Sequence, residues 1–193
     1  MMKYLVMAMA ISLMALGTSC KMKSEYQKRV ETELAKGERH DTLFLGMYFG
    51  MARDSFFKHC MFLNHQELVK QGITGISVSY TLRGADTLRF PTYMDFYPNF
   101  DRDKNKISEM DMNFSYLSWA PWIPATSSDS LALDVVKLFE RWYGPGFVKE
   151  KSPQKGLSYY VKIDGNRQIL VSRADDIKVT AIITDLSALP VKF

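Results

Sequence analysis

The sequence predicts an α+β fold in which helices cover one face of an antiparallel sheet. Two stretches with helical spacing of apolar residues, within 50–72 and 128–142, are each followed by three stretches in which apolar and polar residues alternate. Consecutive strands joined by short turns pair in the antiparallel sense, and helices between such runs pack on one face. The expected order is helix, three strands, helix, three strands, a possible pseudo-repeat without residue identity between its halves.

The first half opens with a short apolar run over 43–49, expected as a strand or an extended lead-in. A helix then begins after Gly50 and ends at Gly72. Alternation predicts a half-buried strand over 76–82 and, after a turn, a second over 88–97, where Pro91 indicates an edge or a bulge. A third strand is expected over 110–116.

The second half begins after a linker bracketed by two prolines. Ser127, Ser128 and Asp129 can cap a helix whose apolar residues recur up to Trp142, and Gly144-Pro145-Gly146 stops it. Strands are expected over 157–163, 169–171 and 177–183, the first two joined by a tight hairpin at Asp164-Gly165. We therefore expect one domain over 42–193, with possible halves 42–117 and 125–193.

The first 19 residues have the pattern of a secretory signal peptide. Lys3 gives a positive start, residues 4–16 are apolar apart from Ser12, and small residues follow. The apolar stretch is shorter than the roughly 20 residues of a membrane span. We expect residues 1–19 to be removed.

The end of this leader, LGTSC, resembles the lipobox of bacterial lipoproteins. That resemblance implies that Cys20 carries the lipid, although Gly17 stands where the stricter motif has leucine. It further implies a membrane partner, the lipid bilayer, and a place in the cell envelope, at the outer membrane, facing the periplasm or the surface. Residues 20–41, dense in both charges, would form a solvated tether; Ser24 to Gln27 matches a capping box within it.

The helix entry FGMARDSFF is similar to the Gly-Met helix start of BamE-like outer-membrane lipoproteins. The whole chain also resembles uncharacterised small lipoproteins of Gram-negative bacteria, which implies no activity.

The composition excludes some classes of partner and bond. Removal of the leader takes away one lysine and no acid, so the formal charge falls from +4 to +3. A nearly balanced charge gives no support for nucleic-acid binding. If Cys20 is lipidated, Cys60 is the one thiol left, and no internal disulfide can form.

No motif indicates catalysis, and we expect no cofactor and no enzyme. Asp101, Asp103 and Asn105 have the start of a calcium loop, but Lys106 and Met112 occupy the glycine and glutamate positions. A polar turn between strands is the preferred interpretation. His59 and His65 are six residues apart, which is not the spacing of a helical metal pair.

The stretch YLSWAPWIP holds the most unusual residues. Tyr116, Trp119 and Trp122 could bind a ligand, since an exposed aromatic ring on a proline-stiffened loop can stack on a sugar or a partner protein. Tryptophan is mostly buried, so the preferred interpretation is that both indoles cap the core between the two halves.

These observations predict a lipid-anchored envelope protein that acts as a binding or scaffold module for a protein partner. The alternatives are a glycan-binding lipoprotein that uses Trp119 and Trp122, or a hydrolase whose catalytic residues are spread over the fold.

Replacement of Cys20 tests the anchor. Cys20→Ala should release the protein from the membrane fraction and abolish incorporation of radiolabelled palmitate, because the thiol is the site of acylation. Cys60→Ala serves as the control and should label normally. Unchanged labelling of the Cys20 variant would disprove lipidation at this residue.

Overall fold

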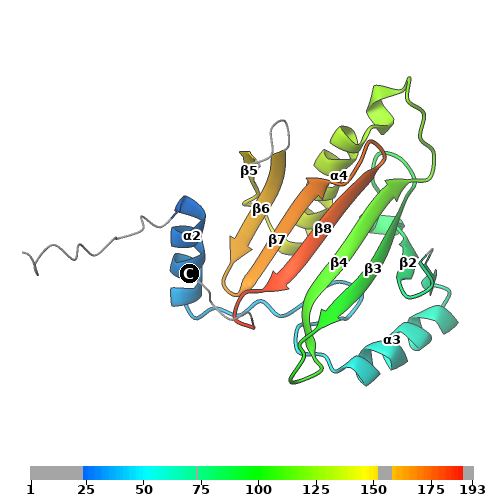
Figure 1. The fold of residues 1–193 in the computed structure, drawn as a ribbon. Helices are drawn as coiled ribbons and strands as arrows, with labels where there is room; N and C mark the ends of the chain where they lie inside the picture. The colour runs from blue at the N-terminus through cyan, green and yellow to red at the C-terminus, as the bar shows by residue number, and fades with distance from the viewer. Residues whose placement is uncertain (1–23, 73, 152–157, 189–193) are drawn as a thin grey trace, which may run out of the picture.

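A computed structural model describes residues 24–72, 74–151 and 158–188 (Figure 1). The leader and Cys20 lie outside the described residues. Within them the chain forms three α-helices and one eight-stranded antiparallel sheet, which confirms the predicted fold class. None of the described helices is long and apolar enough to cross a membrane.

The two halves have the same order of elements, one helix followed by four strands. The helices are α3 (Arg53–His65) and α4 (Ser128–Tyr143), preceded by α2 (Glu25–Ala35). The strands of the first half are β1 (Val69–Gln71), β2 (Val78–Thr81), β3 (Thr92–Phe100) and β4 (Ile107–Tyr116). Those of the second are β5 (Val148–Lys151), β6 (Ser158–Asp164), β7 (Arg167–Arg173) and β8 (Lys178–Asp185).

The sheet order is β1-β2-β3-β4-β8-β7-β6-β5. Each half is therefore a meander, and the last strands of the two halves pair in the middle of the sheet, from Glu109 opposite Thr184 to Ser115 opposite Lys178. The prediction of three strands per half was wrong by one, because β1 and β5, the two edge strands, are short and largely polar.

The predicted helix over 50–72 is too long. The observed helix α3 ends at His65. Beyond it, Leu68 donates its backbone N–H to the carbonyl of Leu63, and the Asn64 amide donates to the carbonyl of Val69 at 2.8 Å. Glu67 takes a positive φ of 56°, which ends a helix. The chain then turns directly into β1, so Gly72 follows a strand and not a helix.

The proline positions in β3 also differ from the prediction. Pro91 precedes the strand, whereas Pro98 lies inside it. β2 pairs with β3 only as far as Phe96, so the missing N–H of Pro98 leaves no ladder bond to β2 unmade. A bulge lies one residue later, between Asn99 and Phe100.

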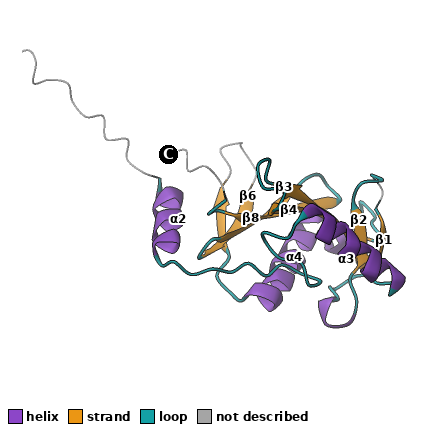
Figure 2. Ribbon diagram, turned by 90° about the horizontal axis from the view of Figure 1, so that it is seen from below, coloured by secondary structure: helices purple, strands orange, loops and turns teal. Residues whose placement is uncertain are grey.

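Helices α3 and α4 lie on one face of the sheet, and α2 stands apart beside β6 (Figure 2). Residue alternation explains this, because one side of every long strand is apolar. In α4 the expected stripe is confirmed: Leu131, Val135 and Leu138 are fully buried. Its Ser127 cap and its Gly144 stop are also as predicted. The largest side chains that fill the core are Phe56, Phe96, Phe114, Phe139, Met47, Met94, Met110 and Met112.

The segment expected as a solvated tether lies against the domain. The capping box of Ser24 and Gln27 forms, and α2 contacts the β5–β7 side of the sheet. Tyr26 donates a hydrogen bond to Gln168, and Arg29 pairs with Glu150 at 2.6 Å.

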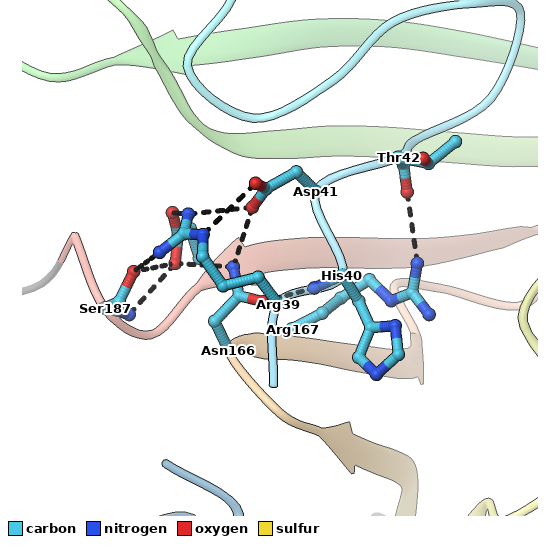
Figure 3. Close-up of polar contacts among 8 residues, drawn as sticks. Arg39, His40, Asp41, Thr42, Asn166, Arg167 and Ser187 are labelled. Carbon is cyan, nitrogen blue, oxygen red and sulfur yellow. Dashed lines mark hydrogen bonds and ion pairs between the residues drawn. The ribbon is translucent and has the colours of Figure 1, made fainter. Parts of the chain in front are cut away.

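Residues 39–42 are held by hydrogen bonds against the same β5–β7 side of the sheet (Figure 3). The buried amide of Asn166 holds this segment from both sides: it accepts the backbone N–H of His40 at 2.6 Å and donates to Asp41 and Asp185. Arg167 donates to the carbonyl of Thr42 at 3.1 Å. These bonds fix residues 39–42 to the β6–β7 turn and to the end of β8.

Gly165 allows this close approach. It lies in the predicted β6–β7 hairpin with φ +53°, and a Cβ there would lie 2.4 Å from the carbonyl oxygen of Glu38. Gly84 has a similar φ, +60°, but a Cβ there would meet nothing within 4 Å.

The two glycines give a matched test of this packing. Gly84→Ala should cost about 1 kcal/mol of unfolding free energy through its left-handed backbone. Gly165→Ala should cost about 1–3 kcal/mol more, since the methyl group also displaces the Glu38 backbone. Urea unfolding of both variants measures the difference. Equal losses of unfolding free energy would show that the backbone at Glu38 does not pack on the β6–β7 hairpin.

Candidate functional site: the open face of the sheet

The face of the sheet opposite α3 and α4 is open over β3, β4 and β8 (Figure 1). The residues that alternate with the core residues there are mainly polar. A groove of about 300 Å³ crosses this surface beside the loop between β1 and β2. Its lining includes Ile76, Tyr93, Asp95, Asp111, Asn113 and Lys178.

Asp95 lies at the centre of the groove. On β3 it stands opposite Asn113 of β4, between the core residues Met94 and Phe96. Its Oδ1 atom is shielded from solvent and has no hydrogen-bond partner among the described residues. A buried acceptor without a donor is unfavourable, and most such atoms in folded proteins are paired. Asp95 therefore lines the groove while one of its two carboxylate oxygens stays shielded and unpaired.

Asp111 is the second carboxylate of the groove. Burial raises the pKa of Asp111; a hydrogen bond from Asn99 opposes this shift, and the nearby charge of Glu109 adds to it. The amide of Asn99 donates to both acids, at 2.8 Å to Glu109 and 2.9 Å to Asp111. These carboxylates are thus held by a neutral donor, and no ion pair to either of them or to Asp95 occurs in the described part of the chain.

Among the described residues, Lys178 is the one cation that lines the groove. It stands opposite Ser115, four residues along β4 from Asp111. At about 3.3 Å per residue that is a separation of roughly 13 Å along the strand. The groove is therefore negative toward Asp111 and positive toward Lys178.

The loop between the two halves carries the predicted tryptophans. Trp122 is 80% exposed and Trp119 38% exposed, so the expectation that both indoles cap the core is wrong. The prolines and a 3-10 turn (Pro124–Thr126), closed by a bond from Thr126 to the Ile123 carbonyl, hold this loop away from the core.

Two other aromatic residues pack in or against the core, the partly buried Trp142 and the buried Tyr116. Trp142 of α4 stacks on Phe44 at 5.6 Å and donates its indole N–H to Asp86 at 2.7 Å. Tyr116 is only 4% exposed and donates to the buried Asp134 at 2.8 Å. Tyr116 is therefore not part of a surface platform with Trp119 and Trp122.

The calcium candidate lies in the turn between β3 and β4. Asp101 Oδ1 accepts the backbone N–H groups of Lys104 and Asp103, and these bonds lower the pKa of the Asp101 carboxyl. Asn105 takes a positive φ of 53°. Oδ1 of Asp101 thus closes the turn, and no group of three His, Cys, Asp or Glu side chains that could hold a metal ion occurs among the residues described.

Cys60 lies half-buried on α3, where burial raises the pKa of its thiol to about 11. A thiol with such a pKa is almost wholly protonated at neutral pH, which makes it a poor nucleophile. The His59 ring forms a hydrogen bond with the carbonyl of Leu45 at 2.6 Å, a contact that positions the loop before α3.

Sequence reasoning did not single out Asp95, Asn99 or Asp111. The alternation of Asp111, Asn113 and Ser115 with apolar residues predicts a strand, but nothing in it distinguishes a groove from an ordinary solvated face. Comparisons of the chain with family models, curated proteins and solved structures find no match.

The exposed Trp122 and the partly buried Trp142 should respond differently to truncation. Trp122→Ala should change the unfolding free energy by less than about 0.5 kcal/mol, because an exposed side chain leaves no cavity. Trp142→Ala should cost about 3–5 kcal/mol. Thermal unfolding combined with acrylamide quenching checks both values, and a large loss of stability in the Trp122 variant would contradict its exposure.

Proposed function

We propose that this chain is a lipid-anchored protein of the bacterial cell envelope, at the outer membrane, that binds a protein partner through the open face of its sheet. The observation that supports the proposal most is the groove over β3, β4 and β8, with its unpaired Asp95 oxygen. The proposal includes no catalysis and no cofactor.

The position of α2 suits such a role. This helix, the first described element, lies at the β5–β7 side of the sheet (Figure 1). The groove is lined mainly by residues of β3 and β4. A membrane anchor a few residues before Ser24 would thus leave the groove accessible.

The exposed Trp122 favours a second candidate function, glycan binding. An indole on a stiff loop offers a flat surface on which a sugar ring can stack. Ile123 and Leu117 are also exposed beside it, so the loop presents apolar area to solvent.

Site-specific cross-linking tests the main proposal. A photoreactive benzoylphenylalanine at Asn113, exposed on the open face, should give a discrete protein adduct in cells; the same probe at Lys137, exposed on α4, should not. The captured protein is then identified, purified and tested for direct binding. Asn113→Arg should weaken that binding at least about tenfold, since a bulky side chain blocks the groove, while Trp122→Ala should not.

Adducts formed equally from both positions would refute an interface on the open face. Binding to purified envelope glycans that is lost in Trp122→Ala and retained in Asn113→Arg would favour the second candidate.

A further inference from the structure

We infer that the loop between β4 and α4, residues 117–127, inserts its tip into the surface of a lipid bilayer, as a second point of attachment beside the lipid at Cys20. The inference deepens the proposed function, on which it rests for the presence of a bilayer near the amino-terminal side of the domain. It assigns the exposed tryptophans to lipid and not to the glycan of the second candidate function.

The loop presents apolar side chains to solvent and carries no charge. The side chains that it exposes are Leu117, Trp119, Trp122 and Ile123. No acidic or basic side chain occurs in residues 112–128. Tryptophan is enriched where a membrane meets water, because its ring is apolar and its N–H is polar. An uncharged tip with two indoles therefore has the composition of a segment that partitions into this interface.

The backbone of the tip is also suited to leave water. An N–H group that enters a lipid environment without a partner is costly. Pro121 and Pro124 have no N–H. The N–H groups of Ile123, Thr126 and Ser127 donate to carbonyl groups within the loop, at 3.0, 3.0 and 3.2 Å. The same bonds make the tip rigid, so little conformational entropy is lost on insertion.

The loop and the amino terminus of α2 point toward the same end of the sheet. The loop follows β4 at the end where β7 turns into β8, opposite the β6–β7 hairpin (Figure 1). Helix α2 runs toward that hairpin: Tyr26 donates to Gln168 of β7, whereas Glu33, further along the helix, accepts the N–H of Gly165 in the hairpin. The amino terminus of α2 is therefore directed to the end of the sheet that carries the loop.

The chain before α2 is long enough to reach the same surface. From Gln168, the partner of Tyr26, to Arg173, the last residue of β7, the strand rises roughly 17 Å. The four Cα–Cα steps from Cys20 to Ser24 span at most about 14 Å. Since the two lengths are close, one bilayer surface can meet both the lipid and the loop. The strands then stand roughly along the membrane normal, and the open face lies to the side, free for a partner.

The charged residues at the base of the loop indicate which kind of lipid binding to expect. Ser128 donates its backbone N–H to the Asp176 carbonyl, which places the β7–β8 turn beside the start of α4. Arg173 pairs with Asp129 at 3.0 Å and with Asp176 at 3.2 Å. Asp175 accepts backbone N–H groups of the turn. This ring of mixed charge gives no general attraction to anionic headgroups. Apolar insertion must therefore supply the binding.

The polar side chains near the indoles favour lipid over sugar. A sugar site needs polar groups that bond to the ligand's hydroxyls. Thr126 donates its hydroxyl to the Ile123 carbonyl at 2.9 Å, and Ser130 donates its own to another loop carbonyl at 3.1 Å. These hydroxyls hold the loop together, whereas insertion into a lipid interface requires no directed hydrogen bond.

Brominated lipid tests the insertion, because bromine quenches indole fluorescence only at short range. The full chain, purified in detergent, is reconstituted into vesicles of phosphatidylcholine brominated near the headgroup, brominated near the chain end, or not brominated. Bromine near the headgroup should quench the indole emission at least about twofold more than bromine near the chain end, since tryptophan stays at the interface. High salt should not weaken the quenching, since the loop carries no charge.

Three variants locate the effect. Trp122→Phe should lower the quenched part of the emission at least about twofold, because Trp122 is the more exposed indole. Ile123→Asp keeps every tryptophan but should reduce quenching at least about threefold, because a carboxylate at the tip resists transfer from water. Met61→Asp, which changes another exposed apolar side chain, on α3, should not. Circular dichroism confirms that each variant is folded, and the wild-type comparison of the lipids stands whether or not a variant folds.

Equal emission in brominated and unbrominated vesicles would overturn the inference, as would unchanged quenching in folded Ile123→Asp. A shift of the emission by oligomers of N-acetylglucosamine, without quenching by lipid, would overturn it in favour of a sugar. A protein adduct from benzoylphenylalanine in place of Trp122, again without quenching, would do so in favour of a protein.

Two further outcomes separate this inference from the proposed function. If Cys20 incorporates palmitate and the probe at Asn113 captures a partner while the indoles stay unquenched, the proposed function stands and the insertion falls. If brominated lipid quenches the indoles but Cys20 is not labelled and nothing is captured from Asn113, the insertion stands and the proposed function fails.

Discussion

The pairing of β4 with β8 is the contact on which the rest of the molecule depends. Each half is a four-stranded meander with one helix, and this single ladder joins the two into one sheet. It aligns Met110, Met112 and Phe114 with Ile183, Ala181 and Val179, all fully buried. The apolar face becomes continuous, and α4 can pack across β4, β8 and β7 through Phe139, whose ring meets Phe114 at 5.8 Å. A one-residue slip would turn this face toward solvent.

The same alternation sets the limits of prediction from sequence. Long strands such as β4 and β8, with strict alternation, and α4, with its cap, stripe and glycine stop, were predictable because local pattern and tertiary burial agree there. β1 and β5 were not, since VKQ and VKEK are short and polar and become strands only by pairing with a neighbour. Trp119 and Trp122 were misjudged for a related reason: the average burial of tryptophan was applied to a loop that Pro121 and Pro124 direct outward, while Trp142 packs against the core.

The candidate site was less predictable than the fold. Asp95 and Asp111 have the period and polarity of any solvated strand face, and their sequence carries no motif. What distinguishes them is tertiary: the β1–β2 loop and the ring of Tyr93 border the groove, and the nearest donors are the neutral Asn99 and Thr184. Such a property depends on which side chains are absent from the neighbourhood, and a single sequence does not give that information.

The bonds that hold residues 24–42 against the sheet connect the proposed anchor with the proposed interface. Arg29 to Glu150, Glu33 to Gly165 and Asn166 to His40 fix residues 24–42 against the β5–β7 side of the sheet. Three residues lie between Cys20 and Ser24, so the four Cα–Cα steps from one to the other span at most about 14 Å. If Cys20 carries lipid, the α2 side of the domain is therefore held close to the bilayer, and a partner must approach the groove from the opposite side of the sheet, over β3. A docked helix thus restricts orientation in a way that a flexible tether of the same length would not.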